Sequence, residues 1–153
     1  MGGRCRLVQF FAAASLAHAA VYYVSSTKGS DSSTGLSPAA PWQSLQRVMR
    51  VTLTAGDSVL LRNGDVFVEA TVVFLTGMAG TRAAPVTISS YADGDSAADR
   101  PLLARPATSA AGPTLTINNS SGVVVAGLEI AGGENGVVFT FDIIGGAEVG
   151  QIN

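Results

Sequence analysis

The sequence predicts an all-β chain whose short strands wind into successive coils. Charged residues make up only 13% of the 153 residues, and 18 glycines accompany many Val, Ala, Ser and Thr residues. Low charge with many turn-forming residues favours short strands over a helical bundle. Residues 56–69 show the repeating unit, which is a Gly-Asp turn, a short apolar strand, a polar turn and a second strand. Strands this short, joined without helices, suit a coil that winds in one direction.

The first 19 residues have the three parts of a secretory signal peptide. Arg4 and Arg6 form a positive beginning, residues 7–17 form an apolar stretch, and Ala17-His18-Ala19 is a small-x-small cleavage site. The apolar stretch of about eleven residues is shorter than the roughly twenty that a membrane helix requires. A buried N-terminal helix is the alternative interpretation. We expect cleavage after residue 19, secretion of residues 20–153, and no membrane anchor after cleavage.

Removal of the signal changes the charge and the chemistry of the chain. Arg4 and Arg6 leave, so the 9 basic residues become 7 against 11 acidic residues, and the net charge becomes −4. An acidic chain without a basic patch does not suit nucleic acid or an anionic membrane surface. Cys5 and His18 leave as well, so residues 20–153 hold no cysteine or histidine. Disulfides, Ser-His-Asp or Cys-His catalysis and an ordinary zinc site are therefore excluded.

Residues 20–55 are expected to form an N-terminal strand, a loop and a short capping helix. Residues 21–24 are β-prone, and residues 28–38 are rich in Gly, Ser and Asp, which favour turns. Ser44 is placed to cap the helix. The apolar residues that fall near helical spacing on one face are Leu45, Val48, Met49 and Leu53. We expect Trp42 to pack at this cap, and stacking on a sugar is the alternative.

Residues 56–141 are expected to form the coils. The β-prone runs are residues 59–61, 66–74, 86–88, 101–103, 114–118, 122–126, 128–131 and 137–141. The run 66–74 is broken by Glu69 and by the small residues Ala70 and Thr71. Equivalent runs are spaced by roughly twenty to thirty residues, which lies within the range of stacked repeats. The positions expected to face the interior are Leu115, Ile117, Val123, Val125, Leu128, Ile130 and Val137 or Val138.

The order of these elements resembles the N-terminal part of secreted right-handed parallel β-helix proteins, which have the pectate-lyase-like fold. The resemblance covers residues 21–139 and is strongest at residues 56–69 and 85–91. An extended Tyr-rich strand, a Gly-Ser-Asp loop and a short amphipathic helix open many such proteins. The resemblance implies a right-handed, single-stranded parallel β-helix of few coils, in which the short N-terminal helix covers the open end.

Residues 142–153 are Gly-rich and show no clear further strand. At least three coils are needed before stacking becomes favourable, and the chain offers three to four without a recognisable C-terminal cap. We therefore expect a truncated chain, and a complete short β-helix is the alternative.

The only carboxylate cluster is formed by Asp93, Asp95 and Asp99. An Asp-x-Asp start resembles the beginning of a calcium loop, but the full pattern with its terminal Glu is absent. The segment also falls where parallel β-helix proteins commonly place a turn between strands. We expect a solvated turn and no cofactor, with calcium as the alternative.

Asn118 and Asn119 begin two overlapping glycosylation sequons, Asn118-Asn119-Ser120 and Asn119-Ser120-Ser121. In a β-helix, asparagines at such turns can instead stack between coils as hydrogen-bonded ladders. The sequence leaves both interpretations open.

The resemblance places no catalytic residue on this chain. Polysaccharide lyases of this fold use a Lys or Arg beside calcium held by acidic residues, and the related hydrolases use paired Asp side chains. Lys28 lies in the N-terminal loop. The arginines without a matching acidic cluster on an evident shared strand face are Arg62, Arg82, Arg100 and Arg105. We therefore predict no catalytic, cofactor-binding or metal-binding residue.

The resemblance implies a role with extracellular or cell-wall polysaccharide, by lyase or hydrolase chemistry on coils beyond this chain. A non-catalytic glycan-binding or surface-adhesion module is the alternative from another class, so whether the protein is an enzyme stays open. We expect a monomer. A two-sheet β-sandwich is the alternative fold, and it predicts cleaner alternation and hairpin turns of the Asn63-Gly64 kind.

Overall fold

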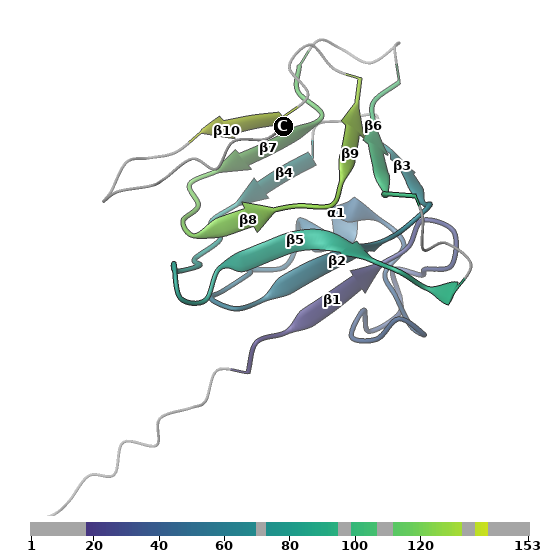
Figure 1. The fold of residues 1–153 in the computed structure, drawn as a ribbon, viewed down its shortest axis with the longest axis horizontal. Coiled ribbons are helices and arrows are strands. Elements are labelled where there is room, and N and C mark those ends of the chain that lie inside the picture. Colours follow the sequence, from purple (N-terminus) through teal and green to yellow (C-terminus); the bar gives the residue numbers. More distant parts are fainter. Residues whose placement is uncertain (1–17, 70–72, 95–98, 107–111, 133–136, 141–153) are drawn as a thin grey trace, which may run out of the picture.

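The computed structural model describes residues 18–69, 73–94, 99–106, 112–132 and 137–140, which form ten short strands and one short helix (Figure 1). In chain order the elements are β1 Val21–Val24, α1 Leu45–Val48, β2 Ser58–Arg62, β3 Val66–Val68, β4 Val73–Thr76, β5 Val86–Tyr91, β6 Leu102–Ala104, β7 Leu115–Asn118, β8 Val123–Val125, β9 Glu129–Ala131 and β10 Val137–Thr140.

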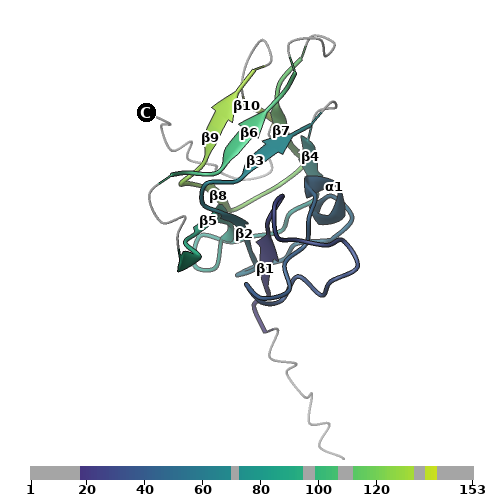
Figure 2. The ribbon, with the colours of Figure 1, turned by 90° about the vertical axis from the view of Figure 1, so that its right-hand side faces the viewer.

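The strands gather into three sheets that the chain visits in a fixed order. The first sheet has the strand order β1-β2-β5-β8, the second β3-β6-β9 and the third β10-β7-β4. From β2 onward every third strand returns to the same sheet, so β2–β4, β5–β7 and β8–β10 form three stacked coils. Figure 1 shows the coils stacked upward from β1, and Figure 2 shows β3, β6 and β9 side by side.

All strand pairs in the described part of the chain are parallel. This pairing excludes the β-sandwich, which requires antiparallel neighbours joined by hairpins. The Asn63-Gly64 turn, in which Gly64 has a φ of 77°, joins β2 to β3, and these two strands lie in different sheets. The prediction of an all-β parallel fold is therefore confirmed.

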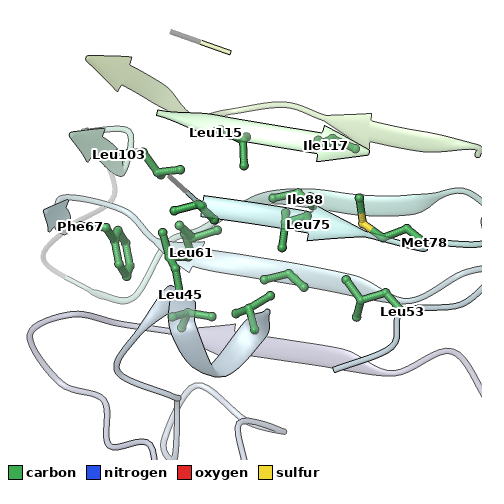
Figure 3. Close-up of a cluster of buried hydrophobic side chains, with 14 of the residues drawn as sticks. Leu45, Leu53, Leu61, Phe67, Leu75, Met78, Ile88, Leu103, Leu115 and Ile117 are labelled. Carbon is green, nitrogen blue, oxygen red and sulfur yellow. The ribbon is translucent and has the colours of Figure 1, made fainter. Parts of the chain in front are cut away.

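Inward residues from the three sheets form one apolar core (Figure 3). The register places equivalent residues of successive coils in columns. Val59, Ile88 and Val125 form a column in the first sheet. Phe67, Leu103 and Ile130 form the equivalent column in the second. Each fully buried side chain of this kind contributes roughly 1.5–3 kcal/mol of transfer free energy, so the columns hold the coils together.

The predicted inward positions agree with this core. Leu115 and Ile117 are buried, and the last coil contributes partly buried residues that pack against the core. These partly buried residues are Val123, Val125, Leu128 and Ile130. The side chains of Val137 and Val138 lie outside the described part of the structure.

A loop covers the free edge of β1. The backbone N–H of Tyr23 donates to the carbonyl of Gly35 at 2.7 Å, and the N–H of Trp42 donates to the carbonyl of Tyr23 at 2.9 Å. The N–H of Ser25 then donates to the carbonyl of Trp42 at 2.8 Å. An edge strand with satisfied amides cannot template pairing with another chain. The Gly-Ser-Asp loop therefore protects this edge of the first sheet.

The predicted capping helix is present as the single turn α1. The Ser44 side chain accepts a hydrogen bond from the backbone N–H of Arg47 at 3.2 Å, as expected of an N-cap residue. Leu45, Val48 and Leu53 are buried in the core, with relative exposures of 4%, 2% and 2%. Figure 3 shows Leu45 on this helix beside the strand residues of the core.

Trp42 packs within the protein, as predicted, with a relative exposure of 2%. Its ring stacks on Tyr22, with ring centroids 4.7 Å apart, and the Arg47 guanidinium lies 4.7 Å from its ring centroid. Its indole N–H donates to the carbonyl of Ser33 at 3.1 Å. The ring is enclosed on these sides, so the sugar-stacking alternative for Trp42 is wrong.

The structure divides one β-prone run where a break was expected and shortens another. The run of residues 66–74 is divided into β3 and β4, which belong to different sheets. Strand β3 ends at Val68, directly before Glu69, which is the first residue of the expected break. The run at 128–131 starts as a strand at Glu129, while Leu128 packs against the core.

Residues 1–17 and 141–153 lie outside the described structure, so the signal peptide and the Gly-rich tail stay predictions. Within the described ranges, no helix has the length and apolar character needed to cross a membrane.

Candidate functional site

The ion pairs found among the described residues lie together where β1, β2 and β5 end and the chain turns from the first sheet. We call this group the corner cluster, and its members are Ser25, Thr27, Lys28, Arg62, Asp65, Tyr91 and Asp93. Parallel pairing brings the group together, because Arg62 and Tyr91 are register partners at the ends of β2 and β5. Residues far apart in the sequence therefore meet at one corner.

Asp65 is the buried centre of the corner cluster, with a relative exposure of 1%. Its Oδ2 accepts a hydrogen bond from the Ser25 hydroxyl at 2.7 Å. Its Oδ1 accepts from the Thr27 hydroxyl at 2.8 Å and from Arg62 Nη1 at 2.9 Å. A carboxylate with several donors is stabilised in its ionised form, and here it ties the turn after β1 to the turn after β2.

Arg62 bridges two carboxylates. Its Nη1 pairs with Asp65, and its Nε lies 3.2 Å from Asp93 Oδ2. The same Asp93 oxygen accepts from Lys28 Nζ at 2.9 Å. The sequence showed no acidic cluster for Arg62 on a shared strand face, and the acids that pair with it, Asp65 and Asp93, reach it from turns instead.

The cluster is buried on one side and open on the other. The side chains of Arg62 and Asp65 are 11% and 0% exposed, whereas those of Asp93 and Lys28 are 34% and 56% exposed. Solvent and ligands can therefore reach Lys28 and Asp93, while the ion pair beneath them is structural.

The surroundings of the corner cluster stabilise the ionised forms of its two carboxyl groups. Burial raises the pKa of Asp65, but hydrogen bonds from Ser25, Thr27 and Arg62 outweigh it and hold that pKa below its usual value. Hydrogen bonds from Lys28 and Arg62 lower the pKa of Asp93. Neither carboxyl is placed to act as a proton donor near neutral pH.

Tyr91 adds an aromatic ring and a hydroxyl to the cluster. Its ring meets the Tyr23 ring edge to face, with centroids 5.1 Å apart. Burial, followed by the charge of Asp93, raises the pKa of Tyr91 to about 12. Its hydroxyl oxygen is buried and has no hydrogen-bond partner among the described residues. This hydroxyl is the unsatisfied polar atom at the site.

Glu69 directly follows β3, at the end of this strand opposite Asp65, and its pKa is raised above the usual value of a glutamate. Burial is the largest cause, and hydrogen bonds to Gln46 and the Leu45 backbone partly oppose it. These partners belong to α1 and its surroundings, so Glu69 does not pair with the carboxylates of the corner cluster.

The predicted carboxylate cluster is only partly described. Asp93 is engaged by Lys28 and Arg62, and Asp95 lies outside the described residues. Asp99 is exposed, and its backbone carbonyl accepts from the Gly64 N–H at 2.8 Å. The described ranges contain no group of three or more His, Cys, Asp or Glu residues suited to a metal. Calcium binding here remains an untested alternative.

The two sequon asparagines differ in exposure. Asn118 ends β7, and its Oδ1 is buried without a hydrogen-bond partner among the described residues. Asn119 is exposed and has a φ of 45°. The register partners of Asn118 are Thr76 and Thr140, so an asparagine ladder is not formed at this position.

The remaining predicted arginines do not join the corner cluster. Arg82 and Arg100 are exposed, whereas Arg105 is 8% exposed and donates from Nη1 to the carbonyl of Pro113 at 3.0 Å. The Ser25, Thr27 and Asp65 network was not predicted. A signal for it exists in retrospect, because hydroxyl residues directly follow β1 and an Asp directly precedes β3.

No family model matches the chain. A curated lacto-N-biosidase from Bifidobacterium longum subsp. longum is 45% identical over 76 residues, which cover 48% of this chain and 5% of that protein. The chain therefore spans a small fraction of the length of this relative.

Two solved structures of a GH136 lacto-N-biosidase from Eubacterium ramulus have a similar fold. The selenomethionine form matches with a TM-score of 0.58 and 25% identity, over 84% of this chain and 22% of that one. The native form gives a TM-score of 0.57 at 24% identity. A rhamnogalacturonan lyase matches with a TM-score of 0.52 and 19% identity, over 71% of this chain and 28% of that chain. The parallel all-β architecture is thus shared with a glycoside hydrolase and a lyase.

Proposed function

We propose that the chain is the N-terminal part of a secreted right-handed parallel β-helix protein that handles glycans. The observation that carries this proposal is the order of the three parallel sheets, visited in the same sequence by three coils. The likeness to a lacto-N-biosidase, in sequence and in fold, supports it. The rhamnogalacturonan lyase adds support from fold alone.

In its full-length form the protein is a polysaccharide lyase or a glycoside hydrolase under this proposal. The chain covers 22% of the matched lacto-N-biosidase structure, so the catalytic residues belong to further coils. Extracellular or cell-wall polysaccharide is the proposed substrate class.

For this segment itself, the corner cluster favours binding over cleavage. Glycoside hydrolysis with two carboxyl groups requires one of them to be protonated, with a raised pKa, so that it can donate to the leaving oxygen. Asp65 and Asp93 instead share the Arg62 guanidinium, and both have lowered pKa values. The non-catalytic glycan-binding module is therefore the second candidate function.

The open side of the cluster offers the groups that sugars require. Lys28 donates and Asp93 accepts, which suits the paired hydroxyls of a pyranose. The partly exposed rings of Tyr23 and Tyr91 supply apolar surface for the C–H face of a sugar. We propose that a glycan contacts this surface, with the Arg62–Asp65 pair as its rigid support.

Isothermal titration calorimetry of residues 20–153 tests the binding proposal. The ligands are a lacto-N-biose-containing oligosaccharide and soluble rhamnogalacturonan. We expect Lys28→Ala and Asp93→Ala to weaken binding, and Arg82→Ala, an exposed cation away from the cluster, to leave it unchanged. No heat with either glycan, or equal losses in all three variants, would refute a glycan site at this corner.

Cleavage is tested with the same sample. We expect residues 20–153 to release neither unsaturated nor reducing-end products from pectin, alginate or the two ligands above. Release of such products would place catalysis within this segment and overturn its assignment to further coils.

A further inference from the structure

The backbone nitrogen of Ala20 contacts a buried carboxylate. Its N–H donates to Asp57 Oδ1 at 2.8 Å, and the Ala20 carbonyl accepts from the Ser58 N–H at 2.8 Å. Ala20 is also the residue that follows the predicted cleavage site Ala17-His18-Ala19. Asp57 therefore binds the residue with which the secreted chain is predicted to begin.

The surroundings of Asp57 fix its carboxylate toward Ala20. Asp57 is 6% exposed. Its Oδ2 accepts from the N–H of Thr54 at 2.8 Å and from the Thr54 hydroxyl at 3.0 Å. Oδ1 therefore remains to accept the hydrogen bond from Ala20. The backbone of Asp57 is held at the start of β2, because its carbonyl accepts a hydrogen bond from the Thr87 N–H at 2.9 Å.

We infer that Asp57 is a built-in receptor for the α-ammonium group of Ala20 after the signal peptide is removed. The inference rests on the secretion proposed above. A signal-processing protease would hydrolyse the bond between Ala19 and Ala20. The water oxygen would join the Ala19 carbonyl carbon, the C–N bond would break, and both water protons would end on the Ala20 nitrogen. The products are an Ala19 carboxylate and an Ala20 ammonium group.

Processing then changes the nature of an existing contact. Before cleavage the uncharged Ala20 amide donates to the carboxylate, and after cleavage the donor carries a full positive charge. The contact therefore gains the Coulomb attraction between two opposite charges in addition to the hydrogen bond. His18 and Ala19 are exposed, so a protease can reach the bond while Asp57 keeps its position.

The contact also distinguishes between two cleavage positions. Ser15-Leu16-Ala17 has the same small-x-small pattern, and cleavage after it would place the ammonium group on exposed His18. Only cleavage after Ala19 delivers the charge to Asp57. Mass spectrometry of the secreted protein should therefore find Ala20 as the first residue, and a mature chain that begins elsewhere would overturn the inference.

The stabilising effect is tested with three forms of the chain at pH 6, where a free α-amino group is protonated. These are residues 20–153 with a free amine, the same form acetylated at the N terminus, and residues 19–153. Acetylation keeps one N–H donor and removes only the charge. We expect the equilibrium constant for unfolding in urea to rise about fivefold in the second and third forms.

The variant Asp57→Asn provides the control. It keeps an oxygen acceptor but removes the negative charge, so the free and acetylated forms should become equally stable. Equal stability of these two forms in the wild-type background would refute the receptor, and that comparison does not depend on the variant folding. A difference that survives in Asp57→Asn would also refute it. Glycan binding is measured separately, so its failure leaves this result standing.

Discussion

Arg62 and Asp65 form an ion pair with an Nη1–Oδ1 distance of 2.9 Å, and the side chains of the two residues are 11% and 0% exposed. The pair lies at the turn between the first and second sheets and links Ser25, Thr27 and Asp93 through hydrogen bonds. Removing charges from water is costly, so a buried pair is tolerated only when its remaining donors and acceptors are satisfied. Here Asp65 meets that condition.

Replacement of Asp65 by Ala should lower the free energy of unfolding by up to about 3–5 kcal/mol, because it removes the buried partner of Arg62 and leaves only the partly exposed Asp93 paired with the guanidinium. Urea denaturation followed by circular dichroism measures this change. The control is Asp99→Asn, which alters an exposed side chain and should shift stability by less than about 0.5 kcal/mol. Similar effects of the two substitutions would show that the ion pair is not structural.

The Gly35→Ala substitution should be more destabilising than Gly77→Ala. The two glycines have φ angles of 73° and 70°, so the conformational cost of a left-handed alanine, about 1–2 kcal/mol, is the same in both variants. A Cβ at residue 35 would also overlap the ring of Trp42, whereas a Cβ at residue 77 would meet nothing within 4 Å. We expect an extra loss of about 1–3 kcal/mol for Gly35→Ala. Equal melting behaviour of the two variants would contradict this packing.

Tyr91 should ionise well above the ordinary tyrosine range. Absorbance at the tyrosinate band, followed during a pH titration, should show one ionisation near the pKa of about 12 that is missing in Tyr91→Phe. Because the folded-state pKa exceeds the unfolded value of about 10, the stability contribution is complete below pH 10 and is lost as the pH rises toward 12. A Tyr91 step at the ordinary value would mean that the ring is solvated.

The Tyr91→Phe variant should also be nearly as stable as the wild type at pH 7. The Tyr91 hydroxyl is buried without a hydrogen-bond partner among the described residues, so its removal breaks no bond described in the structure. A loss above about 1 kcal/mol in thermal or urea unfolding would reveal a partner for this hydroxyl.

Amides of β5 should exchange with deuterium more slowly than amides of β8. Strand β5 is paired on both sides, with β2 and β8, whereas β8 pairs only with β5 in the described part of the sheet. Opening a central strand requires more bonds to break. Hydrogen exchange with mass spectrometry distinguishes peptides covering these strands, and equal protection would show that the outer edge of β8 is covered.

The strand positions and much of the core could be predicted because β-prone runs and the turn formers between them are visible in the local sequence. Leu115 and Ile117 alternate with polar residues inside a run bounded by turn formers, and they are buried as predicted. Ser44 precedes the helix by one residue and caps it. These features depend on near neighbours in the chain, which a single sequence shows.

The corner cluster could not be predicted in the same way. The partners of Arg62 are Asp65, three residues later, and Asp93, thirty-one residues later. The second partner depends on the register between β2 and β5, which pairs Arg62 with Tyr91. Register is a property of the stacked coils, and without it an arginine near a strand end cannot be matched with its acid.

The covered edge of β1 leaves the first sheet open to further strands only on the side away from β1. Loop carbonyls and amides occupy that edge, and from β5 onward every strand of the described sheets pairs with the strand three places before it. Each new coil therefore needs only the coil made before it. A chain synthesised from its N terminus can therefore form its coils in the order of synthesis, each on the one before it.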